Sequence, residues 1–203
     1  MSKEKYDPQH SNHSFVSEEN LIMRLSILIF AWALLLASCK EVSYKEAQPA
    51  GLPPLKEVPP NLHGIYQVYD QTTGEFSDTL IIESWGYHMK DKKEKDWLGR
   101  GTLSDTLVLK FYQNYYFVNF KFDDQWVLRL IKQHPDGSFE FLSIDLQDDV
   151  KGKDKLTKIS KKLKMTELKK KDDTYYQINP TPAQLIKLIK EGYFTGAKLT
   201  KIK

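Results

Sequence analysis

Apolar and polar positions alternate in short runs through the middle of the chain, which has 203 residues. Leu107, Leu109 and Phe111 illustrate the pattern, because the residues between them are more polar or smaller. A period of two is typical of a strand that buries one face. Turn residues separate the runs, and the Pro-Asp-Gly sequence at 135–137 is the strongest such signal. The predicted strands are residues 64–69, 76–83, 103–111, 115–122, 125–132 and 138–146.

These strands follow one another without helices between them, which favours an antiparallel meander. The middle strands are apolar on both faces. In 125–132, Trp126 and Leu128 lie on one face and Val127 and Ile131 on the other. Both faces must therefore be covered, by a strongly curled or barrel-like sheet or by a packed helix. Residues 86–101 are polar and are interpreted as a connection.

A helical pattern appears only in the C-terminal third. Leu156, Ile159 and Leu163 are spaced at i, i+3 and i+7, which predicts a helix over 153–163. Thr181 and Pro182 are a typical N-cap and first residue of a second helix, which a glycine ends at position 192. Shorter strands are predicted at 165–169, 175–179 and 194–202. The fold is thus predicted to be one mainly β (α+β) domain over residues 61–203, with two helices.

The sequence Gly64-Ile65-Tyr66 near the first strand, and a helix before the last strand, resemble the lipocalin plan. The Gly-x-Trp of that family is Gly-x-Tyr here, and its C-terminal arginine is not identifiable. The resemblance implies a binder of a small apolar ligand, provided that the sheet encloses an open interior.

An apolar run of twelve residues, interrupted only by Ser26, covers 25–36 and follows Arg24. A membrane-spanning helix needs about 20 apolar residues, so this run is typical of a secretory signal. It ends in Leu-Ala-Ser-Cys at 36–39, which resembles the lipobox of bacterial lipoproteins. The resemblance implies removal of a signal peptide at 23–38, by cleavage between Ser38 and Cys39. It also implies a diacylglycerol and an acyl chain on Cys39. An uncleaved signal anchor is the alternative.

The predicted anchor places the protein in the cell envelope. Lys40 is not the aspartate that signals inner-membrane retention in enterobacterial lipoproteins, so the resemblance implies the outer membrane. Residues 1–22 are interpreted as a non-structural extension, with translation expected to start at Met23. The proline-rich residues 39–60 are predicted to form a tether. As a whole, the chain resembles small uncharacterised lipoproteins of Gram-negative envelopes, a resemblance that does not indicate any particular activity.

Positive charge is concentrated in one segment. Residues 151–171 hold ten lysines and two acidic residues. Lys161, Lys162 and Lys164 are therefore candidate contacts for a polyanion or for anionic headgroups. The alternative is a solvated helix face, because aromatic residues are not interleaved with the lysines. No nucleic acid partner is expected.

Catalytic signals are sparse. Ser-Asp-Thr-Leu occurs at 77–80 and again at 104–107, which raises Asp78 and Asp105 as a carboxylate pair for acid–base catalysis. The alternative is that each copy ties down the backbone where a strand starts. The single cysteine, Cys39, excludes a disulfide within the chain, and no histidine spacing matches a metal motif. We expect no enzyme activity, no metal and no cofactor beyond the lipid.

The sequence leaves three functional hypotheses. The first is a membrane-anchored envelope lipoprotein that acts as a non-catalytic interaction or structural module, with an unknown envelope protein as partner. The second is a lipocalin-like binder of a small apolar ligand. The third is a hydrolytic enzyme that uses Asp78 and Asp105.

Overall fold

The computed structural model describes residues 40–69, 74–90, 99–171 and 173–203. All described residues belong to one compact unit, Cys39–Lys203. The predicted signal peptide, the cleavage site at Ser38 and the lipid-bearing Cys39 lie outside the described residues. Within the described ranges, no helix is long and apolar enough to cross a membrane.

The described part of the chain holds twelve strands, two α-helices and one short 3-10 helix. In chain order these are β1 Lys40–Tyr44, η1 Pro60–Leu62, β2 Gly64–Tyr69, β3 Phe76–Glu83, β4 Gly86–Met89, β5 Arg100–Thr102, β6 Leu107–Tyr112, β7 Tyr115–Phe122, β8 Gln125–Gln133, β9 Phe139–Ser143, α2 Asp149–Ser160, β10 Met165–Lys170, β11 Asp173–Ile178, α3 Pro182–Lys190 and β12 Thr195–Lys201. The segment predicted as a polar connection thus contributes two strands, β4 and β5.

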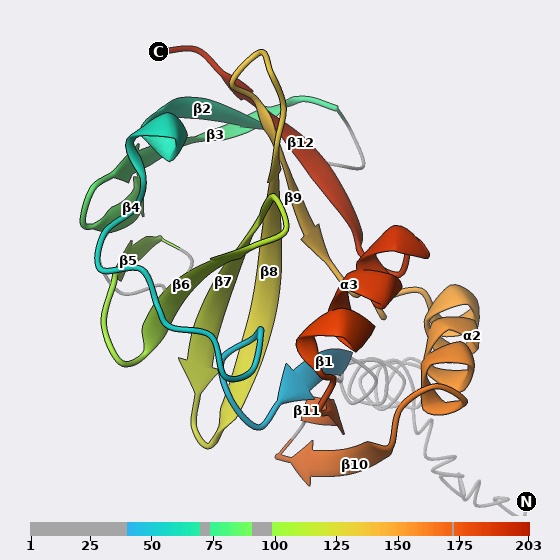
Figure 1. The fold of residues 1–203 in the computed structure, drawn as a ribbon. Coiled ribbons are helices and arrows are strands. Elements are labelled where there is room, and N and C mark those ends of the chain that lie inside the picture. Colours follow the sequence, from blue (N-terminus) through green and yellow to red (C-terminus); the bar gives the residue numbers. More distant parts are fainter. Residues whose placement is uncertain (1–39, 70–73, 91–98, 172) are drawn as a thin grey trace, which may run out of the picture. The chain divides into compact units, whose positions relative to one another are not determined.

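Consecutive antiparallel ladders build most of the sheet. Strands β2 to β5 form one series and β6 to β9 another, and β12 joins them by pairing with both β9 and β2. Among the described residues, no ladder joins β5 to β6, so the sheet curls without closing into a barrel (Figure 1). The predicted mainly β fold with two helices in the C-terminal third is confirmed.

Strand β1 lies between β11 and β8. It runs parallel to β11, with Val42 opposite Tyr176, and antiparallel to β8, with Tyr44 opposite Trp126. A parallel pair requires a long crossover, and here it is the whole chain from β2 to β10. The sheet is therefore mixed, rather than antiparallel throughout as the meander predicted.

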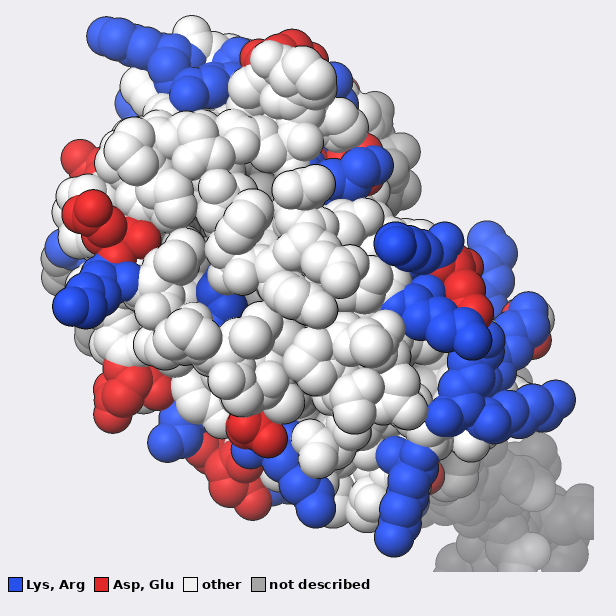
Figure 2. All heavy atoms as spheres, viewed as in Figure 1, with Lys and Arg blue, Asp and Glu red and all other residues white. Residues whose placement is uncertain are grey.

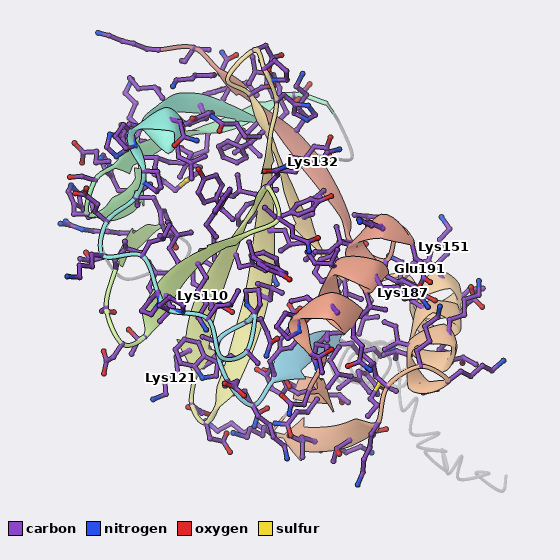
Figure 3. The ribbon with its side chains drawn as sticks, in the orientation of Figure 1. Lys110, Lys121, Lys132, Lys151, Lys187 and Glu191 are labelled. Carbon is purple, nitrogen blue, oxygen red and sulfur yellow. The ribbon has the colours of Figure 1, made fainter. Side chains whose placement is uncertain are left out.

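The predicted tether over 39–60 is wrong for residues 40–60. Val42 and Tyr44 are only 3% and 1% exposed, and Val58 is buried as well. The buried Lys110 on β6 donates hydrogen bonds to the carbonyl oxygens of Ala47 (2.7 Å) and Pro49 (3.0 Å) (Figure 3). The prolines thus belong to a segment that packs on the sheet. The folded domain includes Lys40 and does not begin near residue 61.

Two apolar clusters lie on opposite faces of the sheet. On β7, Phe117 contributes to the cluster that includes the helices, whereas Val118 and Phe120 contribute to the cluster inside the curl. Successive side chains of a strand point to opposite faces, so one strand serves both clusters. This arrangement explains why the middle strands are apolar on both faces.

The two helices begin at capped residues. The carboxylate of Asp148 accepts hydrogen bonds from the amides of Val150 and Lys151, so α2 begins four residues before the predicted 153. Thr181 and Gln184 form a capping box at the start of α3, as the Thr-Pro sequence predicted. The apolar face of α3 packs into the first cluster.

Candidate ligand-binding cavity

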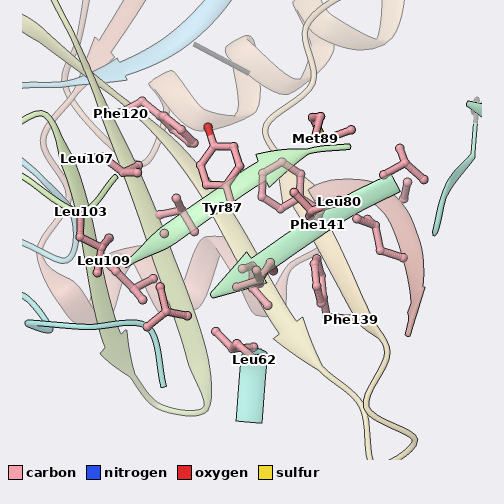
Figure 4. Close-up of a pocket in the computed structure, with 18 of the residues that line it drawn as sticks. Leu62, Leu80, Tyr87, Met89, Leu103, Leu107, Leu109, Phe120, Phe139 and Phe141 are labelled. Carbon is pink, nitrogen blue, oxygen red and sulfur yellow. The ribbon is translucent and has the colours of Figure 1, made fainter. Parts of the chain in front are cut away.

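A cavity of about 330 Å³ lies within the second apolar cluster, inside the curl of the sheet (Figure 4). Its wall is built from pairs of residues two positions apart on several strands. Three of these pairs are Leu80 and Ile82 on β3, Leu107 and Leu109 on β6, and Phe139 and Phe141 on β9. Alternation along each strand directs both members of a pair to the same face, which here is the inner one.

The segment before β2 adds to the cavity wall. Leu62, at the end of η1, is 1% exposed and points from the short helix towards the cavity (Figure 4). Val58 also lines the cavity, and its amide donates a hydrogen bond to the carbonyl oxygen of Ser84 (2.8 Å). The residues predicted as a tether therefore help to form the candidate site.

The lining has almost no polar character. None of the described lining residues carries a charged side chain. Tyr66 packs beside the cavity wall, with its ring 4.6 Å from that of Phe139, and its hydroxyl donates to the carbonyl oxygen of Leu62 (2.9 Å). Burial raises the pKa of Tyr66 to about 12, so this phenol is neutral at physiological pH. The cavity suits an apolar group, which gains from burial, and disfavours an ion, which loses its hydration.

The cavity wall reaches solvent at the β2–β3 hairpin. Tyr69 lines the cavity yet is 37% exposed. Its ring meets that of Phe76 edge-on at 6.4 Å, and Phe76 is 56% exposed. An exposed aromatic pair at the edge of an apolar cavity gives a ligand an apolar path from the surface.

The structure places the three candidate lysines in and beside the end of α2. Lys161 is the C-cap of α2, and Lys164 is an exposed residue just before β10. Lys162 lies 2.8 Å from a carboxylate oxygen of Glu191, and this hydrogen bond raises the pKa of Lys162.

Other lysines gather along α2 (Figure 2). They line a hollow that also contains Asp154 and Glu191, so carboxylates offset part of the positive charge. Polyanion contact at Lys161, Lys162 and Lys164 stays a prediction.

The structure places the two aspartates of the repeated motif in local roles near the start of a strand. Asp78, on β3, accepts a hydrogen bond from the amide of the next residue, Thr79 (2.7 Å). Asp105 is exposed in the β5–β6 connection, where the Ser104 hydroxyl accepts from the amides of Thr106 and Leu107. In both copies, a side-chain oxygen accepts hydrogen bonds from nearby backbone amides, as the alternative interpretation of the motif predicted. Across the described ranges, no cluster of three or more His, Cys, Asp or Glu residues could hold a metal ion.

The cavity was only partly visible in the sequence. The alternating pairs Leu107 and Leu109, or Leu80 and Ile82, indicate inward faces, but nothing local shows that these faces leave space between them.

Comparisons of the chain with protein families, with curated protein sequences and with solved structures each find no match.

Proposed function

We propose that this protein is a non-catalytic binder of a small apolar ligand, which it holds in the cavity inside the curled sheet. One observation carries the proposal. The cavity of about 330 Å³ stays open although large side chains surround it, and this volume falls in the range of about 300–1,000 Å³ that is usual for ligand sites.

The apolar lining of the cavity supports occupancy by a ligand. Because the cavity is apolar and its wall reaches solvent, its lining is in contact with water when no ligand is bound, and covering apolar surface is favourable by about 25 cal/mol per Å². An apolar ligand gains this free energy and also makes dispersion contacts with the lining. For this reason we place the ligand binder ahead of a module that acts only through a protein partner.

The proposal includes a lipid anchor on Cys39, at the cell envelope and on the outer membrane. The lipobox sequence supports it, and Lys40 already belongs to β1. With no spacer between the lipidated residue and the first strand, the domain would stand at the bilayer surface. Apolar ligands are most abundant there, since they partition into the bilayer.

Binding is tested with the full chain, purified in a zwitterionic steroid detergent, which has no alkyl chain to compete. A fluorescent alkyl probe is titrated and then displaced by lauryl alcohol. The variant Ala197→Phe places a ring in the cavity, because Ala197 lines it on β12. The matched control is Ala183→Phe on the exposed side of α3.

We expect Ala197→Phe to weaken probe binding at least about tenfold, while Ala183→Phe binds like the wild type. Melting temperatures show that both variants fold. Equal probe affinity in all three proteins would reject the cavity as the binding site.

The anchor is tested separately by labelling cells with palmitate. Cys39→Ala is expected to lose the label and to leave the membrane fraction, whereas Lys40→Ala keeps both. A Cys39→Ala chain that still carries palmitate would reject lipidation at this residue.

A further inference from the structure

The gap between β5 and β6 contains a second hollow, of about 220 Å³. Among the described residues, β5 pairs only with β4 and β6 only with β7, so no ladder seals this seam. The second hollow shares Tyr87, Leu107 and Phe120 with the apolar cavity. The two spaces therefore adjoin through the seam.

Gly101 lies where the second hollow meets the apolar cavity. A Cβ atom at this position would lie 2.5 Å from Cε1 of Tyr87 and 2.7 Å from Cδ2 of Leu107. Both of those side chains line the cavity, so position 101 faces inward and any side chain there would displace them. The absence of a side chain at position 101 lets Tyr87 and Leu107 pack directly against β5, so side chains and not a backbone ladder separate the two spaces at the seam.

The second hollow differs from the cavity in chemistry. Its lining includes two threonines, Thr102 and Thr106, and two cations, Arg100 and Lys121, and none of its described lining residues is acidic. Arg100 precedes the inward-facing Gly101, and Lys121 follows the inward-facing Phe120, so alternation places both cations on the outer face of the sheet.

The two cations stand on opposite sides of the seam. The Arg100 guanidinium carbon lies 5.0 Å from the ring centroid of Trp85, and the Lys121 Nζ lies 5.9 Å from that of Trp126. A group that emerges through the seam thus meets a cation on β5 and another on β7.

We propose that the ligand is a single-chain anionic amphiphile, with its alkyl chain in the cavity and its head in the seam, between Arg100 and Lys121. This inference rests on the proposed function and names its ligand class. An anionic head inside the apolar cavity would lose its hydration, whereas the seam offers solvent, hydroxyl groups and positive charge. A fatty acid and a phosphate-headed lipid share this chemistry.

The test uses the full chain in the same detergent and compares laurate, lauryl phosphate and lauryl alcohol as competitors of the alkyl probe. The three share one chain and differ in the head. We expect laurate to bind about tenfold more tightly than the alcohol, as a charge-assisted hydrogen bond implies. Tighter binding of laurate than of lauryl phosphate identifies a fatty acid, and the reverse order identifies a phosphate head. Either order supports the proposal.

The double variant Arg100→Gln with Lys121→Gln is expected to remove the preference for laurate and to leave alcohol binding unchanged. The swap Arg100→Lys with Lys121→Arg keeps the charge and should keep the preference. Lys153→Gln on α2 with Lys190→Gln on α3 removes the same net charge at exposed positions that do not line the second hollow, and serves as the matched control.

Two results overturn the inference and leave the proposed function intact. One is equal binding of laurate and lauryl alcohol by the wild type. The other is a preference for laurate that survives neutralisation of Arg100 and Lys121. If none of the three compounds displaces the probe, or if Ala197→Phe binds all of them normally, the proposed function fails as well.

Discussion

The side-chain amide of Asn119 and the backbone of Gln48 hydrogen-bond to each other in both directions, across 71 positions of the chain. The Asn119 Oδ1 accepts from the Gln48 amide at 2.6 Å, and its Nδ2 donates to the Gln48 carbonyl oxygen at 2.8 Å. Both side chains are fully buried. Together with the Lys110 amine, this pair fixes the segment after β1 on the outer face of β6 and β7.

Asn119→Ala should destabilise the protein by about 2–6 kcal/mol, because it leaves two buried backbone groups of Gln48 unsatisfied and each costs about 1–3 kcal/mol. Chemical unfolding of the full chain measures the change. The exposed Asn179 provides the control, since Asn179→Ala should change stability by less than about 0.5 kcal/mol. Similar values for the two variants would show that the segment is not held by Asn119.

Tyr44→Ala tests whether the start of the domain lies in β1. Tyr44 is 1% exposed and packs in the cluster beneath the helices, so its truncation should cost about 3–5 kcal/mol. Lys45→Ala, one residue later and exposed, should be nearly neutral. If Tyr44→Ala unfolds at the same denaturant concentration as the wild type, residues 40–44 are a tether after all.

The β8–β9 turn should contribute a pH-dependent part of the stability. Asp136 accepts hydrogen bonds from the hydroxyl and the amide of Ser138, and these bonds lower the pKa of Asp136 to about 2. A carboxyl with a lowered folded-state pKa stabilises the protein above its unfolded pKa of about 3.9 and loses that effect as the pH falls through about 2. The wild type should therefore exceed Asp136→Asn in stability near neutral pH and converge with it in acid. A difference that is constant from neutral pH to pH 2 would contradict this assignment.

Local chemistry made some elements predictable and left others hidden. The capping box of Thr181 and Gln184 starts α3 through neighbours in the sequence, so the sequence alone predicted this helix. Strand β1 depends on β11 and β8, which are distant in the chain, and the prolines that follow it suggested a tether. A strand whose partners are all remote has little local signal, because its ladder forms only in the folded chain.

The cavity was hidden for a related reason. Each inward pair, such as Leu107 and Leu109, is visible as alternation, but an open interior depends on how far the sheet curls and on the summed volume of side chains from many strands. The second hollow depends in addition on Gly101, which in the sequence reads only as part of a polar connection.

Ligand binding should stabilise the fold. Lauryl alcohol at about 100 times its dissociation constant should add about 2.7 kcal/mol to the unfolding free energy of the wild type, since only the folded state has the cavity. Ala197→Phe, which is expected to bind at least about tenfold more weakly, should gain at most about 1.4 kcal/mol from the same addition. Equal stabilisation of both proteins would mean that the alcohol acts outside the cavity.

Native mass spectrometry of the full chain, extracted gently from the cells that make it, tests the central claim most directly. The account predicts one additional mass per chain, in the range of a single-chain lipid, on the wild type and on Ala183→Phe but not on Ala197→Phe. A wild-type chain that is released without any bound molecule, and that acquires none when single-chain lipids are added, would contradict the account.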